Sequence, residues 1–283
     1  MTRPAIEPLT EQNLPEFAAF LHLHLNPARS AADWQAGLSV GWLAERPNHG
    51  FLLRDDGKVV GGIGAYYAMR KIAGRNEKFC NITSWCVLDA YRQQSMRLAM
   101  AVVSQPGYHF TDFSPTKVVG ATLRFFKFQP LDERQIVIPN LPWPASGGLM
   151  VLHRPREIEA ALQGDALQVY RDHAVFPWLR HALLGRPGAW CHVIYKTRLL
   201  KGLPMADILH ASNHAVLQTG LRQLASHLLT RGFVTTQVEY RWLAKRPRAS
   251  ALRTGFNQKL YLSSSLGEAD IDYLYSETVA LDL

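Results

Sequence analysis

The chain has 283 residues, of which 47% are hydrophobic and 19% are charged, the balance of an ordinary folded globular protein. Its 31 Lys and Arg residues outnumber its 23 Asp and Glu residues, and the formal net charge of +8 favours polyanionic partners. No apolar run approaches the roughly 20 residues that span a bilayer, and the first residues contain no apolar signal-peptide region. We therefore expect a cytoplasmic protein without a membrane span.

The cysteines and histidines do not form the patterns of a disulfide framework or a metal site. Cys80, Cys86 and Cys191 are odd in number and lack the paired C-x-x-C spacing of zinc ligands. His22 and His24 are two positions apart and cannot share one face of a helix. We expect buried thiols and no metal.

The first half of the chain alternates predicted strands and helices. A short strand near Ile6 precedes a helix with Phe17, Phe20 and Leu21 on one face. Asp56-Gly57 lies between two apolar runs, a pattern that predicts a β-hairpin. The following residues predict a strand over 79–87, a helix over 95–103, a strand over 108–113 and a helix over 116–126.

Three prolines and two glycines between residues 139 and 148 prevent regular structure and predict a domain boundary. We therefore expect domains over 1–138 and 150–283, joined by a linker over 139–149. The second domain reads as strands over 189–200 and 205–211, a helix over 214–230 and a strand over 234–242. The step from helix to glycine to strand around Gly107 recurs around Gly232, which favours an internal duplication. Strands over 259–264 and 270–276 would complete the second sheet.

The most informative segment covers residues 87–98, Val-Leu-Asp-Ala-Tyr-Arg-Gln-Gln-Ser-Met-Arg-Leu, where a predicted strand ends and a helix begins. The first N–H groups of a helix are unpaired and carry a partial positive charge, which suits them to bind a pyrophosphate. Arg92 and Arg97 would add positive charge at the same place. The segment therefore predicts an anion-binding loop, with these candidate residues: Val87, Arg92, Gln93, Gln94, Ser95, Met96 and Arg97.

This segment resembles the acyl-CoA loop of the GNAT superfamily of acyl-CoA N-acyltransferases, which typically reads V-x-P-x-x-R-G-x-G-x-G/A. Val87 and Arg92 match the valine and the arginine, and Asp89 stands where proline is usual. Gln93, Ser95 and Arg97 replace the small residues, and Arg97 places a long side chain where the family normally has none. The resemblance implies either that Arg97 contacts the donor or that this half has lost ordinary coenzyme A binding.

A fainter match covers Thr116–Phe128, which resembles the family segment N-x-x-A-x-x-x-Y-x-x-x-G-F. Phe128 is the one identity in this alignment, and Leu123 falls where the pattern commonly has the tyrosine that protonates the leaving thiolate. The resemblance then implies that the usual general acid is absent. In the second half it rests on the order of elements alone.

The resemblance implies an α/β fold of mixed, mostly antiparallel sheets with flanking helices, repeated in tandem. It also implies an acyltransferase that moves an acyl group from acetyl-CoA, a longer acyl-CoA or an acyl carrier protein to the amine of a small molecule or peptide. Two alternatives stay open. Tandem acyltransferases also resemble FemAB-type enzymes, which transfer amino acids from charged tRNA, and the missing glycines and tyrosine would suit a catalytically silent binding module.

Amine acylation needs a base for the proton of the amine and an acid for the leaving sulfur. Asp112, at the end of a predicted strand, is the candidate base, with a solvated strand-end carboxylate as the alternative. Tyr91, beside the loop, is a candidate acid, with packing under the loop as the alternative. Glu239, on a predicted strand of the second half, is a further candidate, with an exposed strand glutamate as the alternative.

Overall fold

The computed structural model describes residues 3–143 and 147–282, and the chain forms two compact units. The first unit contains the chain up to Leu131, then Asn257–Ile271 and the residues from Tyr275 onward. The second contains Asp132–Phe256 and Asp272–Leu274. Residues 144–146 of the predicted linker lie outside the described residues.

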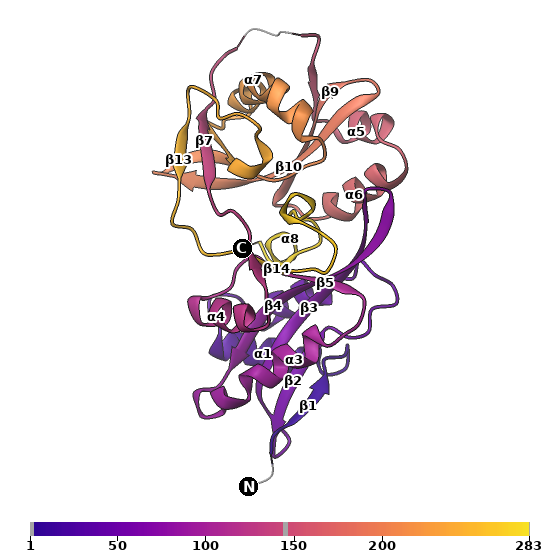
Figure 1. Cartoon of the computed structure of the whole chain (residues 1–283), viewed down its shortest axis with the longest axis vertical. Helices are drawn as coiled ribbons and strands as arrows, with labels where there is room; N and C mark the ends of the chain where they lie inside the picture. Colours follow the sequence, from indigo (N-terminus) through magenta and orange to yellow (C-terminus); the bar gives the residue numbers. More distant parts are fainter. Residues whose placement is uncertain (1–2, 144–146, 283) are drawn as a thin grey trace. The chain divides into compact units, whose positions relative to one another are not determined.

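The first unit is built on a mixed sheet of seven strands, in which β4 and β5 are parallel and every other neighbouring pair is antiparallel (Figure 1). Across the sheet the strands are β1 (Ala5–Pro8), β2 (Gly50–Asp55), β3 (Lys58–Ile72), β4 (Arg75–Val87), β5 (Tyr108–Asp112), β14 (Leu260–Leu262) and β6 (Gln129–Pro130). The helices are α1 (Leu14–His24), α2 (Ala31–Ser39), α3 (Ser95–Val103), α4 (Lys117–Phe125) and α8 (Glu277–Ala280), with 3₁₀ turns η1 (Asp89–Gln94) and η3 (Glu268–Asp270).

Alternating side chains of the central strands give this sheet an apolar layer on each face. Leu52 and Tyr66 pack with α1 and α2, whereas their neighbours Leu53 and Tyr67 belong to the core under α3 and α4. Gly62 allows the close approach of α1, because a Cβ there would lie 2.4 Å from the Phe17 ring. The sheet is therefore covered by helices on both faces, because its central strands carry apolar side chains on both faces.

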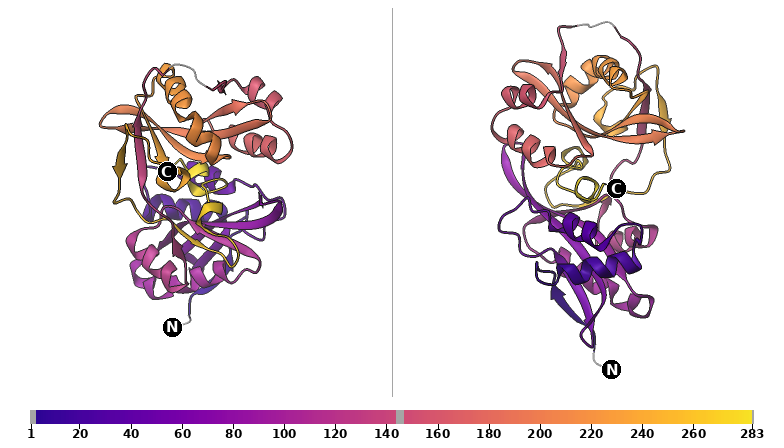
Figure 2. Two further views of the ribbon diagram at one scale, coloured as in Figure 1. Left: turned by 45° about the horizontal axis from the view of Figure 1, so that its top comes forward. Right: turned by 180° about the vertical axis from the view of Figure 1, so that it is seen from behind.

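The second unit repeats this plan on a second seven-stranded sheet, in which β11 and β12 are the parallel pair. Across the sheet the strands are β13 (Ala251–Arg253), β7 (Gln135–Pro139), β12 (Thr235–Glu239), β11 (Leu203–Ala211), β10 (Ala189–Leu200), β9 (Leu179–Arg186) and β8 (Met150–Leu152). Its helices are α5 (Pro155–Ala161), α6 (Gly164–Ala174) and α7 (His214–Thr230), with the 3₁₀ turn η2 (Tyr240–Trp242). Figure 2 shows α7, in orange, lying along this sheet.

The two units share a parallel crossover, as the duplication predicted from sequence requires. In the first, β4 leads through α3 and Gly107 to β5, and in the second β11 leads through α7 and Gly232 to β12. Both glycines have positive φ, of 80° and 89°, which a residue with a Cβ rarely adopts. The predicted α/β class of mixed, mostly antiparallel sheets is confirmed, and so are the helices over 95–103 and 214–230.

Two expectations about the end of the chain are wrong. The strand predicted over 259–264 is present as β14, but it pairs with β5 in the first sheet rather than completing the second. No strand forms over 270–276, where η3 is followed by irregular backbone. The units consequently differ from the predicted domains over 1–138 and 150–283. A sheet edge pairs with whichever strand reaches it, and β6, with two residues, is too short to cover β5.

Among the described residues, no helix is long and apolar enough to cross a membrane.

Buried histidines cross the second sheet on the face covered by α6. Nδ1 of His181 on β9 lies 3.1 Å from Nε2 of His192 on β10, and the rings of His192 and His210 on β11 are 5.9 Å apart. His210 Nδ1 in turn lies 2.9 Å from Asp272 Oδ2. Burial lowers the pKa of His181 to about 4 and that of His173, on α6, to about 3. The folded chain thus favours the neutral form of His173 and His181.

We predict that the second unit loses stability below about pH 6.5. Between pH 6.5 and 4 the unfolded chain binds protons that buried His173 and His181 do not, so the free energy of unfolding falls with pH. His181→Gln should reduce the loss between pH 7 and 4.5 by about 2 kcal/mol, measured by urea unfolding at each pH. The exposed His24→Gln is the control. Equal pH slopes in all three proteins would contradict this account.

We also predict that β14 stabilises the first unit rather than the second. Leu260 is fully buried, so Leu260→Ala should lower the free energy of unfolding by about 2–5 kcal/mol. Hydrogen exchange should become faster in peptides covering β5 and stay unchanged in those covering β12. Leu252→Ala, on the equally short β13 but 39% exposed, is the matched control. Faster exchange in β12 instead would refute the pairing.

Candidate functional site

The first sheet opens between its two parallel strands. Pairing of β4 with β5 covers four residue pairs and ends at Asn81 and Thr111. The Asn81 amide nitrogen lies 3.1 Å from Thr111 Oγ1, across the last pair. Beyond this point β4 continues to Val87, whereas β5 ends at Asp112 and turns into α4. The divergence leaves a gap in the hydrogen-bonded sheet.

A bulge in β4 lies at the start of this gap. Gly62 and Gly64 of β3 pair with Cys86 and Thr83, so two residues of β4, 84 and 85, oppose one residue of β3. Ser84 has φ of 50°, a left-handed conformation that few residues other than glycine adopt. Such strain is concentrated at functional sites, where surrounding structure holds it in place. The bulge turns Ser84 and Trp85 toward the space between the strands.

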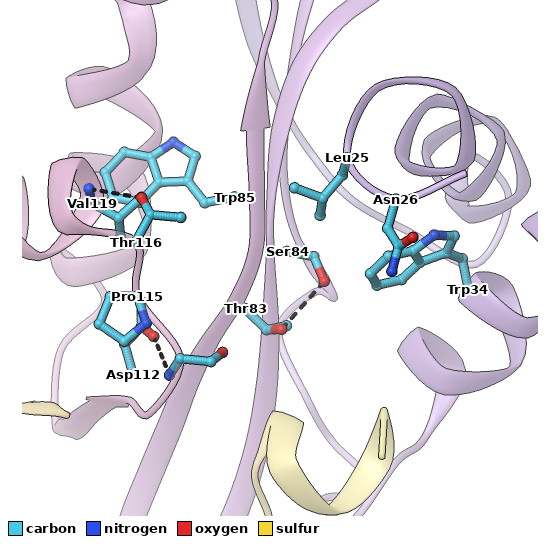
Figure 3. A pocket seen from close by; sticks show the side chains of 11 residues that line it. Leu25, Asn26, Trp34, Thr83, Ser84, Trp85, Asp112, Pro115, Thr116 and Val119 are labelled. Carbon is cyan, nitrogen blue, oxygen red and sulfur yellow. Dashed lines mark hydrogen bonds between the residues drawn. The ribbon is translucent and has the colours of Figure 1, made fainter. Parts of the chain in front are cut away.

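A pocket of 360 Å³ occupies this place in the first unit (Figure 3). Its walls come from the end of α1, from α2, from the β4 bulge and from the β5–α4 turn. The lining residues are Leu25, Asn26, Trp34, Thr83, Ser84, Trp85, Asp112, Ser114, Pro115, Thr116 and Val119. Asp112 is the one ionisable side chain among them, and it lies among apolar and neutral polar side chains, a combination found in small-molecule sites.

Asp112 carries an unusual electrostatic environment. Its side chain is 4% exposed, and its Oδ1 accepts a hydrogen bond from the Ser114 amide at 3.2 Å. Burial raises the pKa of Asp112 well above its usual range, and the negative charge of Glu277 raises it further. A carboxyl group of this kind keeps its proton at pH values where an ordinary aspartate has lost it.

Two indole groups in the pocket wall have no hydrogen-bond partner. Trp34 Nε1 and Trp85 Nε1 are buried, and neither donates to any atom in the described part of the chain. A buried N–H group without a partner costs free energy unless something accepts its hydrogen bond. The Arg29 guanidinium lies 5.2 Å from the centre of the Trp34 ring and holds that indole in place. The two indole N–H groups are therefore buried donors whose hydrogen bonds are unmade within the described residues.

The predicted anion-binding loop forms the turn η1 and the start of α3, not the pocket wall. Two of its amides are used internally, because Tyr91 N donates to Leu88 O and Ser95 N to Arg92 O. None of its candidate residues, from Val87 to Arg97, lines the pocket described above. A glycine-rich loop would leave such amides free for phosphates, so here the positive side chains would have to bind them.

The loop side chains already have local partners. Arg92 is 75% exposed and lies 2.8 Å from Asp89, whereas Arg97 donates to the Pro4 carbonyl at 2.9 Å. The Tyr91 hydroxyl donates to Asp55 Oδ2 at 2.7 Å, and this bond raises the pKa of Tyr91. Tyr91 therefore lies against the β2–β3 hairpin and is a weaker acid than a free tyrosine.

Glu239, the candidate from the second half, lies in a buried polar network of the second unit. It is 1% exposed, and its carboxylate accepts hydrogen bonds from the Tyr273 hydroxyl and Arg241 Nε. The side-chain amide of Gln135, on β7, donates to Glu239 Oε1 at 3.3 Å. With these partners the Glu239 carboxylate links β7, β12 and the 272–274 segment, a structural role that its strand position alone did not suggest.

Sequence reasoning missed Glu277 and Trp34, which join Asp112 from distant parts of the chain. Glu277 follows a predicted strand that does not exist, and Trp34 lies in α2, a helix that was not predicted from the sequence. Ser30 caps α2, since its Oγ accepts a hydrogen bond from the Asp33 amide at 3.1 Å. A serine at this place in the sequence could have indicated the start of that helix. Among the described residues, no three or more His, Cys, Asp or Glu side chains are grouped as metal ligands.

No family model matches this sequence, and neither does any curated protein. Solved structures do resemble the chain. A GCN5-related N-acetyltransferase from Anabaena variabilis aligns with 92% of this chain and 72% of its own, at 12% identity and a TM-score of 0.63. One from Kribbella flavida covers 91% and 70%, at 12% identity and a TM-score of 0.56. Eis1 from Mycobacterium abscessus covers 91% and 72%, at 14% identity and a TM-score of 0.52.

These likenesses agree with the two mixed sheets and their parallel crossovers. The chain therefore has the fold of the GCN5-related N-acetyltransferases, the GNAT fold, in two tandem units.

Proposed function

We propose that the chain is an N-acyltransferase that moves an acyl group from a thioester to an amine bound in the pocket of the first unit. The observation that carries the proposal is Asp112, the one ionisable group of the pocket, buried at the point where β4 and β5 separate. The solved structures support acyl transfer as the general class, through the fold that they share with this chain.

In this proposal Asp112 is the base. Its carboxylate takes the proton of the amine as the nitrogen attacks the thioester carbonyl, and the C–S bond then breaks. The indole N–H groups of Trp34 and Trp85 would donate hydrogen bonds to oxygen atoms of the acyl donor or of the acceptor. The apolar wall would exclude water, which limits hydrolysis of the thioester.

The donor that fits best is acyl-CoA, or an acyl group on a carrier protein. The pocket would hold the thioester end, and Arg92 and Arg97 would attract the phosphates at the start of α3. Since Tyr91 and Ser95 amides are used within the loop, side-chain charge would replace the usual backbone contacts.

We predict that an acyl-CoA raises the melting temperature of the protein by mass action. The test is a thermal-shift titration with acetyl-, decanoyl- and palmitoyl-CoA. Arg92→Ala and Arg97→Ala should each weaken binding about tenfold, because each removes a charge-assisted contact to phosphate. Arg75→Ala is the matched control, since Arg75 is also about 70% exposed and lies 3.5 Å from the acidic Glu77.

Absence of a shift with every donor would rule out coenzyme A binding and favour a carrier protein or charged tRNA as the donor. Unchanged affinity in both loop variants would instead mean that the loop is not the phosphate site.

We predict that Asp112→Asn lowers kcat/KM by about 10²- to 10⁴-fold, the usual contribution of a general base. Asparagine still accepts the Ser114 hydrogen bond, so the fold should persist. Because the pKa of Asp112 is raised, activity of the native protein should rise with pH above the ordinary aspartate range, and this rise should disappear in the variant. Asp165→Asn, in the second unit, is the control. Full activity in Asp112→Asn would exclude it as the base.

A second candidate is a binding module without catalytic activity. Leu123 is completely buried in the core where the resemblance places a tyrosine, and the loop amides are used internally. This candidate predicts donor binding in the thermal-shift titration without free thiol release over hours in the presence of any amine.

A further inference from the structure

Two carboxyl groups are bonded to the same short turn beneath the pocket. Glu277, the first residue of α8, accepts from the Phe113 amide at 2.8 Å and from Ser114 Oγ at 3.0 Å, both through Oε1. Asp112 accepts from the amide of the same Ser114. The Glu277 amide also donates to Asn81 Oδ1 at 2.9 Å, at the residue where β4 leaves β5. Both carboxyl groups are therefore held against the same turn, residues 112–114.

Both carboxyls are buried, and no ion pair among the described residues neutralises either of them. Glu277 is 0% exposed and Asp112 is 4% exposed. Glu277 Oε2 has no hydrogen-bond partner among the described residues, and neither carboxyl forms a salt bridge there. The other titratable groups nearby are Tyr66 of β3, whose hydroxyl donates to Gly37 O, and Arg29 before α2. Two unpaired negative charges in such a place would repel strongly.

We propose that Asp112 and Glu277 share a single proton, and that Glu277 is a positioning residue that sets the protonation state of the carboxyl facing the substrate. The inference rests on the proposed acyl transfer for its catalytic meaning, although the shared proton is a property of the protein alone. Burial raises the pKa of both carboxyls, and the negative charge of Glu277 raises that of Asp112 further, as expected when two acids in one site retain one proton.

A singly protonated pair supplies both proton transfers of amine acylation. With the proton of the pair on Glu277, the unprotonated Asp112 takes the proton of the attacking amine and then gives it to the departing thiolate. The N–C bond forms, the C–S bond breaks, and the pair ends with one proton, as it began. Asp112 alone touches the pocket, so Glu277 acts through it. Asp112 thereby takes the role of the general acid, which Leu123 cannot fill at the position where the family pattern has a tyrosine.

The test is the titration of the two carboxyl carbons by ¹³C NMR in the native protein, Glu277→Gln and Asp112→Asn. Glutamine keeps an oxygen that accepts from the Phe113 amide, so the C-terminal segment should stay in place. Removing the charge of Glu277 should lower the pKa of Asp112 by about one unit or more. Asp112→Asn should lower that of Glu277 in return, because the coupling is reciprocal. The exposed Glu45→Gln is the control.

The rise of kcat/KM with pH should move downward by the same amount in Glu277→Gln, a change that a merely structural residue would not produce. Unchanged Asp112 titration in Glu277→Gln, together with unchanged Glu277 titration in Asp112→Asn, would overturn the proposal. Coupled titration in a protein that transfers no acyl group from any thioester would uphold the shared proton and refute the proposed function instead.

Discussion

The first unit depends on one constraint, the early end of the parallel pairing between β4 and β5. Four residue pairs join the strands, and the bulge at Ser84 then directs β4 away while β5 turns into α4. A sheet cannot leave polar backbone unpaired in a dry core, so the opening must lie at a solvent-reaching pocket or be filled by a ligand. The pocket, the acidic group and the unpartnered indoles are all at this opening.

The end of the chain completes this arrangement. Residues 257–271 and those from 275 onward belong to the first unit, where β14 covers the edge of β5 and Glu277 binds the turn after it. The second sheet is completed by β7 from the middle of the chain. The strands that end the two crossovers, β5 and β12, therefore each pair with a strand that is distant in sequence, β14 and β7 respectively. Neither the first 138 residues nor the last 134 would form these sheets alone.

The buried carboxyl groups of the two units have different partners. In the second unit Glu239 is paired with Arg241 and hydrogen-bonded to Tyr273, and the histidines bond to one another and to Asp272. In the described part of the first unit, Asp112 and Glu277 have hydrogen-bond donors but no ion pair with a cation. A paired carboxylate keeps its charge and stabilises the fold, whereas an unpaired one holds a proton that chemistry can use. This contrast is the physical reason for assigning the reaction to the first unit.

The sequence determined the local elements and the fold class. Apolar spacing located the helices over 95–103 and 214–230, Asp56-Gly57 located the hairpin, and Gly107 and Gly232 marked the repeated crossover. Asp112 could be found as well, because a strand-end carboxylate is a local feature. The partners of Asp112 could not, since Trp34 and Glu277 approach it from 78 residues before and 165 residues after. Spacing along a chain sets which face a side chain occupies, but only the packing of distant segments decides which strand covers an open edge and which two carboxyls meet.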